Sequence, residues 1–128
     1  MSKASPFIVV VDDEVSICRA LKRLIMSVGF EVNTFGSGVD FLESLSLRCP
    51  DALVLDLHMP GISGYDVQAR LTQAGHKLPV IVITGHDTPQ SRERALDAGA
   101  SVYLRKPVDE KELLDAIRSV TSSGATAG

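Results

Sequence analysis

Five short apolar runs alternate along the chain with stretches that carry apolar residues at helical spacing. Within residues 14–28, for example, Ile17, Leu21, Leu24 and Val28 recur on one face of a helix. Strict alternation of this kind predicts parallel strands joined by right-handed helical crossovers, with helices on both faces of an open α/β sheet. The predicted strands are FIVVV (7–11), FEVNTF (30–35), ALVLD (52–56), VIVIT (80–84) and SVYLR (101–105).

Residues typical of helix ends mark the intervening helices. A Ser, Thr or Asp cap and a proline in the first turn are typical of a helix start, and a glycine after the last turn is typical of a helix end. The first and third predicted helices cover residues 14–28 and 64–73. The second starts at Ser37, with Asp40 in its first turn, and the fourth runs from Thr88 and Pro89 to Gly99. The fifth starts at Asp109, with Glu112 in its first turn.

The polarity of the runs predicts their order in the sheet. Runs 7–11, 52–56 and 80–84 are almost wholly apolar and suit the centre, because a parallel strand there is buried on both faces. Runs 30–35 and 101–105 carry polar residues and suit the edges. The predicted order is 2-1-3-4-5, and ligands of such sheets bind beyond the carboxyl ends of the strands at the switch point.

Composition excludes several classes of protein. With 13 basic and 16 acidic residues the net charge is -3, which argues against direct nucleic acid binding by this segment. No apolar run approaches the roughly 18 residues of a membrane span, and we expect no signal peptide, because the run 7–11 is too short for its apolar region and leads into acidic residues. We therefore expect a cytoplasmic location and no membrane contact.

The length of 128 residues fits one domain, which we place at residues 5–120. The last residues, 121–128, are small and polar and are predicted to form a flexible tail, or a linker to an output domain that is absent from this chain. Cys18 and Cys49 have no CxxC spacing, so neither a disulfide framework nor a zinc site is indicated. Both are expected to be small, partly buried apolar residues.

Three carboxylates follow the first apolar run directly. Glu14 suits the start of the next helix, where the dipole favours acidic side chains, but this explains Asp12 and Asp13 less well. Asp56 ends the third run, Thr84 the fourth, and Lys106 follows the fifth. Because the carboxyl ends of parallel strands lie at one edge, these groups are expected to converge there.

The chemistry of such a cluster follows from its charge. Two carboxylates about 4 Å apart repel by about 4 kcal/mol at an effective dielectric constant near 20. Either one takes up a proton or a hard cation joins them, and oxygen ligands of this kind point to Mg²⁺. A carboxylate beside the metal can attack phosphorus and carry an aspartyl-phosphate, while Lys106 and Thr84 neutralise or bind phosphoryl oxygens.

The segments VVVDDE, VLDLHMPGISG, VIVITGHD and GASVYLRKP resemble, in order and spacing, the receiver domain of two-component response regulators. The resemblance covers residues 7–120 and implies a flavodoxin-like (βα)₅ fold. The phrase LPVIVITGHDTP is similar to receivers of the FixJ and NarL type, which usually precede a helix-turn-helix domain. On this basis the domain would signal to a missing effector that regulates transcription; the alternative is a stand-alone receiver acting in a phosphorelay or as a protein-interaction module.

The resemblance assigns roles to the acidic residues. It implies that Asp56 accepts the phosphoryl group and that Asp13 and Asp56 bind Mg²⁺ directly, while Asp12 holds a metal-bound water. His58 lies where the family uses a backbone carbonyl as a metal ligand, so its imidazole is not implied in binding. A rival interpretation is a zinc or copper site at His58 and His86, but no third ligand of suitable type is spaced with them.

The resemblance also assigns the basic and switch residues. Thr84 and Tyr103 match the switch hydroxyl and the switch aromatic, Lys106 matches the lysine that pairs with the phosphoryl group, and the Lys106–Pro107 bond is expected to be cis. Phosphorylation is expected to draw Thr84 toward Asp56, after which an exposed Tyr103 ring turns inward.

Partners and rival functions follow from the same resemblance. The expected donor is a cognate sensor histidine kinase or a phosphotransfer protein that docks on the first helix near Ser16, Arg19 and Arg23. A phosphorylation-dependent homodimer is also possible through the fourth helix, fifth strand and fifth helix. The domain is not expected to be a classical enzyme, although it would assist its own phosphorylation and dephosphorylation. The rivals are a phosphatase of the haloacid dehalogenase type, whose Asp-x-Asp motif is lacking, and a degenerate binding module.

Overall fold

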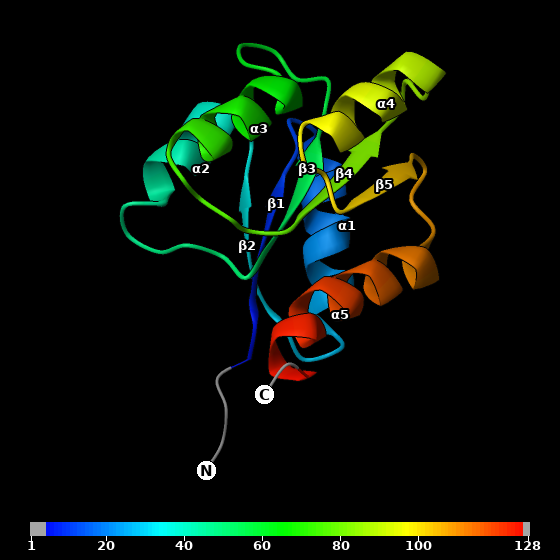
Figure 1. Ribbon diagram of the computed structural model, residues 1–128. Coiled ribbons are helices and arrows are strands. Elements are labelled where there is room, and N and C mark those ends of the chain that lie inside the picture. The colour runs from blue at the N-terminus through cyan, green and yellow to red at the C-terminus, as the bar shows by residue number, and fades with distance from the viewer. Residues whose placement is uncertain (1–4, 127–128) are drawn as a thin grey trace.

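The computed structural model of the chain describes residues 5–126, and the surroundings of side chains up to residue 122. Within this range strands and helices alternate strictly, as the sequence predicts (Figure 1). The strands are β1 (Phe7–Val11), β2 (Glu31–Phe35), β3 (Ala52–Asp56), β4 (Val80–Thr84) and β5 (Val102–Arg105). The helices are α1 (Val15–Met26), α2 (Gly38–Ser44), α3 (Gly64–Gln73), α4 (Pro89–Asp97) and α5 (Glu110–Thr126).

The strands form one parallel sheet in the order β2-β1-β3-β4-β5, which confirms the predicted order. Val11, the last residue of β1, lies opposite Phe35 of β2 and Leu55 of β3. Asp56, the last residue of β3, lies opposite Ile83 of β4. This register brings the carboxyl ends of the central strands level, so residues that follow them share one edge of the sheet.

Each face of the sheet is covered by its own set of helices. Helices α1 and α5 lie on one face and α2, α3 and α4 on the other (Figure 1). Successive residues of β1 point to opposite faces, so Ile8 and Val10 pack toward α1 and α5, whereas Val9 and Val11 pack toward α2, α3 and α4. All four are buried, which is the reason the run reads as continuously apolar.

Most helix boundaries follow the predicted cap residues. The side chains of Ser37 and Thr88 each accept a hydrogen bond from the backbone N–H three residues later, at 3.1 and 3.0 Å. Pro89 is the first residue of α4, and Gly99 after that helix has a φ of +103°, a conformation that favours glycine. Ser63 forms a full capping box at the start of α3, which sequence reasoning missed.

Other boundaries differ from the prediction. Helix α1 ends at Met26 because the N–H groups of Val28 and Gly29 bond to carbonyls three residues back, which tightens the chain into a turn. Helix α5 runs to Thr126, and residues 127–128 of the predicted tail lie outside the described part.

The two cysteines differ in environment. Cys18 is buried, as expected, but Cys49 is exposed, and the expectation of partial burial is wrong for this residue. It lies in the irregular segment between α2 and β3. Among the described residues, none of the helices combines the length and the apolar character needed to cross a bilayer.

Candidate functional site

The carboxyl edge of the sheet gathers four polar side chains from different strands. Asp12 follows β1, Asp56 ends β3, Thr84 ends β4 and Lys106 follows β5. Asp12, Asp56 and Thr84 are buried, with exposed fractions of 0%, 3% and 0%. Buried carboxylates require partners, because an unpaired charge in the interior is very unfavourable.

Lys106 is the cationic partner of these carboxylates. Its Nζ lies 2.8 Å from Asp12 Oδ2, 3.4 Å from Asp56 Oδ1 and 3.9 Å from Glu14 Oε1. Burial opposes the charged ammonium, but the contact with Asp12 and the charge of Asp56 outweigh it and raise the pKa of Lys106. The lysine is therefore held in its charged form between the two buried carboxylates.

One lysine does not neutralise the whole cluster. Carboxylate oxygens of Asp12, Asp13 and Asp56 lie within 4.8 Å of one another, and Asp13 is the exposed member. Burial, and then the charge of Asp12, raise the pKa of Asp56 to about 6, although Lys106 acts in the opposite direction. This rise shows that ionised Asp56 is unfavourable without a further cation.

The cluster has the properties of a hard-cation site. All three ligand atoms are carboxylate oxygens, which suit Mg²⁺ better than soft metals. Asp12 Oδ2 is buried and, beyond its ion pair with Lys106, accepts no well-directed hydrogen bond from the described residues. A divalent cation would supply the charge and the coordination that these oxygens lack.

Local backbone contacts hold the acidic residues in place. Asp12 Oδ1 accepts a hydrogen bond from the backbone N–H of Glu14 at 2.9 Å, and its carbonyl accepts one from the Cys18 thiol at 3.2 Å. The start of α3 packs directly on the last residue of β3, where a Cβ at Gly64 would collide with the carbonyl oxygen of Asp56. Glycine at position 64 is therefore needed for this close approach.

Thr84 has a hydrogen-bond arrangement that sequence reasoning did not find. Its Oγ1 accepts a hydrogen bond from the backbone N–H of His86 at 3.0 Å and lies 3.2 Å from Nδ1 of His58. The His58 and His86 rings meet edge to face, with centroids 4.9 Å apart. Partial burial, followed by the charges of His86 and Lys106, lowers the pKa of His58.

The imidazoles of His58 and His86 do not complete a metal site among the described residues. The cluster of potential ligands at this edge comprises only carboxylates, and neither histidine belongs to it. The rival zinc or copper interpretation therefore lacks the third ligand that it needs.

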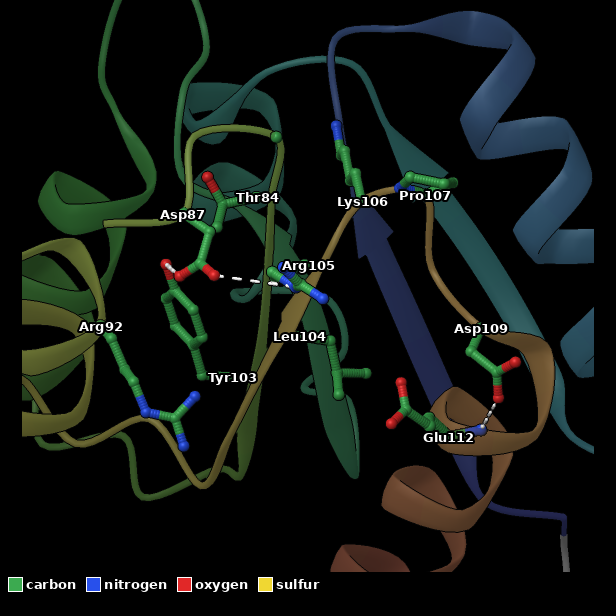
Figure 2. Close-up of a pocket in the computed structure, with 11 residues that line it drawn as sticks. Thr84, Asp87, Arg92, Tyr103, Leu104, Arg105, Lys106, Pro107, Asp109 and Glu112 are labelled. Carbon is green, nitrogen blue, oxygen red and sulfur yellow. Dashed lines mark hydrogen bonds and ion pairs between the residues drawn. The ribbon is translucent and has the colours of Figure 1, made fainter. Parts of the chain in front are cut away.

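Tyr103 is already turned inward, so the expectation of an exposed ring is wrong. The side chain is only 7% exposed, and its hydroxyl donates a hydrogen bond to Asp87 Oδ1 at 3.0 Å. Arg105 Nε lies 3.7 Å from the other oxygen of Asp87, and the Arg92 guanidinium lies 5.4 Å from the ring centroid (Figure 2). Burial, and then Asp87, raise the pKa of Tyr103 to about 12.

These residues line an open hollow of about 790 Å³ along α4, β5 and α5. Figure 2 shows Tyr103 and Arg105 converging on Asp87 within it, while Lys106 points away from them. The hollow extends from Thr84 to Glu112 on α5, so Thr84 belongs both to the carboxyl edge of the sheet and to this surface.

The Lys106–Pro107 peptide bond, which follows β5, is cis, as expected.

The chain matches a known family along most of its length. The family model of the response regulator receiver domain matches residues 8–118, and the chain therefore belongs to this family of signalling domains. A crystal structure of a response regulator receiver protein from Burkholderia phymatum has a TM-score of 0.82 at 46% identity, covering 92% of this chain and 96% of that one.

Two longer relatives match the same region. Nodulation protein W of Bradyrhizobium diazoefficiens is 42% identical over 112 residues, which are 88% of this chain and 49% of that protein. Response regulator protein TodT of Pseudomonas putida is 38% identical over 119 residues, which are 93% of this chain and 52% of that protein. The chain thus spans about half the length of these two relatives.

Proposed function

We propose that this receiver domain accepts a phosphoryl group on Asp56 from the phosphohistidine of a sensor histidine kinase or of a phosphotransfer protein. The observation that supports this most strongly is the environment of Asp56. It is a buried carboxylate with a pKa raised to about 6, it lies 3.4 Å from a lysine, and it belongs to a cluster of three acids. A nucleophilic carboxylate with cationic neighbours is what transfer of a phosphoryl group requires.

Mg²⁺ is the proposed cofactor. Asp13 and Asp56 would bind it directly, Asp12 would hold one of its water molecules, and the backbone carbonyl of His58 would be a further ligand. When bound, the ion neutralises charge on the cluster and on the phosphoryl oxygens. We expect modest affinity, because the protein supplies few ligands.

The residues of the chain have distinct roles in the proposed transfer. An oxygen of Asp56 forms the new bond to phosphorus as the bond from phosphorus to the donor imidazole breaks, and the imidazole keeps that electron pair. Lys106 stays protonated and pairs with a phosphoryl oxygen, which leaves its contact with Asp12 as the anchor for its charge. The Thr84 hydroxyl donates a hydrogen bond to a second oxygen. The same groups would position water for later hydrolysis.

The output is proposed to pass through the surface formed by α4, β5 and α5. Because Tyr103 is already buried, phosphorylation would not need to move its ring from solvent; the change would begin at Thr84 and reach this surface through the loop between β4 and α4. The altered surface would be bound by a second receiver or by an effector domain joined through residues 121–128. Such coupling requires the partner to bind the phosphorylated and unphosphorylated states with different affinities. The expected difference in binding free energy is about 1–3 kcal/mol.

We also propose that the domain works in the cytoplasm within a longer regulator of transcription of the FixJ or NarL type. Support comes from the similarity of LPVIVITGHDTP to such receivers and from relatives about twice as long as this chain. The alternative is a stand-alone receiver in a phosphorelay.

Incubation with acetyl phosphate and Mg²⁺, followed by intact mass and free phosphate, tests the proposed chemistry. A receiver gains one phosphoryl group per chain, whereas a phosphatase releases phosphate with repeated turnover, and a degenerate module does neither.

Analytical ultracentrifugation with beryllofluoride tests dimer formation. The affinity of the dimer should increase by roughly 5- to 150-fold if a second receiver is the partner. With beryllofluoride, Thr84→Ala is expected to shift less toward the dimer than the natural sequence does. If the natural sequence stays monomeric with beryllofluoride bound, self-association of this domain is excluded as the output.

A further inference from the structure

The Thr84 hydroxyl has one proton, and the contacts of its oxygen narrow the choice of acceptor before phosphorylation. Thr84 is fully buried, so its hydroxyl needs an acceptor. The His86 contact uses Oγ1 as an acceptor and leaves the proton free. Among the described residues, the only acceptor within hydrogen-bond distance is Nδ1 of His58, at 3.2 Å. In the tautomer of His58 that leaves Nδ1 unprotonated, Thr84 donates this hydrogen bond to His58.

From this contact we infer that His58 is a positioning residue that holds the Thr84 hydroxyl in the unphosphorylated state and competes with the phosphoryl group for its proton. The inference rests on the proposed function, because Thr84 is there expected to donate to a phosphoryl oxygen on Asp56. One hydroxyl proton cannot be donated fully to both acceptors. Phosphorylation would thus have to break the contact with His58 before the switch can move.

The position of His58 suits this role. It lies two residues after Asp56, and its backbone N–H points at Asp56 Oδ1 at 3.5 Å, so the loop that carries the imidazole is tied to the phosphoacceptor. The ring also stands edge to face against Tyr65 and His86, with centroids 6.3 and 4.9 Å away. These two rings restrict the imidazole so that Nδ1 faces Thr84. The side chain is nevertheless exposed to solvent, so it can be replaced without opening the core.

The size of the effect follows from the strength of one hydrogen bond. A typical net contribution corresponds to about a 2- to 12-fold change in an equilibrium constant. Removing the His58 acceptor destabilises only the protein without bound phosphoryl mimic. In the protein with bound mimic, the Thr84 hydroxyl donates to the mimic instead of to His58. Loss of His58 should therefore tighten binding of a phosphoryl mimic by about that factor.

The experiment compares beryllofluoride binding at fixed, saturating Mg²⁺, with the bound fraction measured from backbone amide peaks by NMR. His58→Leu keeps a branched side chain but removes the acceptor, and it should bind about 2- to 12-fold more tightly than the natural sequence. His58→Asn restores an acceptor at the position of Nδ1 and should return to within about twofold. His76→Leu, which removes a histidine near the opposite edge of the sheet, is the matched control and should leave the affinity unchanged.

A second pair of variants separates this role from a general effect on the loop. In a Thr84→Ala background, His58→Leu should give no gain, because there is no hydroxyl proton to release. A gain that persists in that background, a gain in His58→Asn equal to that in His58→Leu, or no gain in His58→Leu would each overturn the inference while leaving the proposed function in place. Failure of the natural sequence to bind beryllofluoride at all would instead overturn both.

Discussion

Replacement of Asp56 by Asn should stabilise the metal-free protein. Burial and the charge of Asp12 raise the pKa of Asp56 from an ordinary value of 3.8 to about 6. A carboxyl group whose pKa is higher in the folded than in the unfolded state opposes folding once it is ionised, and each pKa unit corresponds to about 1.4 kcal/mol. At pH 8 the ionised Asp56 should therefore lower the free energy of unfolding by about 3 kcal/mol.

The pH dependence gives the sign of the effect. The contribution of Asp56 to stability should be most favourable with its carboxyl protonated and should fall as the pH rises from about 4 through 6, where the folded protein releases the proton. Asn cannot ionise, so the advantage of Asp56→Asn should grow from about 1.5 kcal/mol at pH 5 to about 3 kcal/mol at pH 8.

Urea unfolding at several pH values, in the presence of a chelator, measures both quantities. Glu93→Gln, which removes an exposed carboxylate on α4, is the control and should change the free energy of unfolding by less than about 0.5 kcal/mol. Added Mg²⁺ should stabilise the natural sequence more than Asp56→Asn. An Asp56→Asn protein that is no more stable at pH 8, or whose advantage does not depend on pH, would refute the electrostatic reasoning.

Three further predictions use single residues. Asp13→Ala should weaken Mg²⁺ binding by about 10-fold or more and raise the melting temperature of the metal-free protein, because it removes one like charge; a clear drop in melting temperature would contradict the repulsive cluster. Gly64→Ala should lower the free energy of unfolding by about 1–3 kcal/mol in urea, since its Cβ meets the Asp56 carbonyl, and a neutral result would contradict that contact. In the native protein Cys49 should react with a thiol reagent well before Cys18, which should react fully only after denaturation, because Cys49 is exposed and Cys18 is buried. Equal reaction rates for the two thiols would contradict the burial of Cys18.

The sheet could be predicted from sequence because its central strands are buried on both faces. A run such as FIVVV can satisfy that environment only as a strand, and the polar residues that end each run then have to lie at one edge. The strand order and register place Asp12, Asp56 and Lys106 at that edge. There the Lys106 ammonium reaches both carboxylates, at 2.8 Å from Asp12 and 3.4 Å from Asp56.

Contacts between loops could not be predicted in the same way. The pairs His58–Thr84 and Tyr103–Asp87 join segments 26 and 16 residues apart, and they depend on rotamers and loop conformations that no periodicity encodes. The inward Tyr103 ring is the clearest case, because the proposed switch expected the ring to be exposed before phosphorylation. Asp87 holds it inward through a hydrogen bond that sequence spacing does not reveal.

The phosphoacceptor assignment is tested most directly by locating the modified residue. After incubation with acetyl phosphate and Mg²⁺, borohydride reduces an aspartyl-phosphate to homoserine, which peptide mass spectrometry can place in the sequence. The proposal predicts homoserine at position 56 alone and no labelling of Asp56→Asn. Homoserine at position 12 or 13, or stoichiometric labelling of Asp56→Asn, would contradict it.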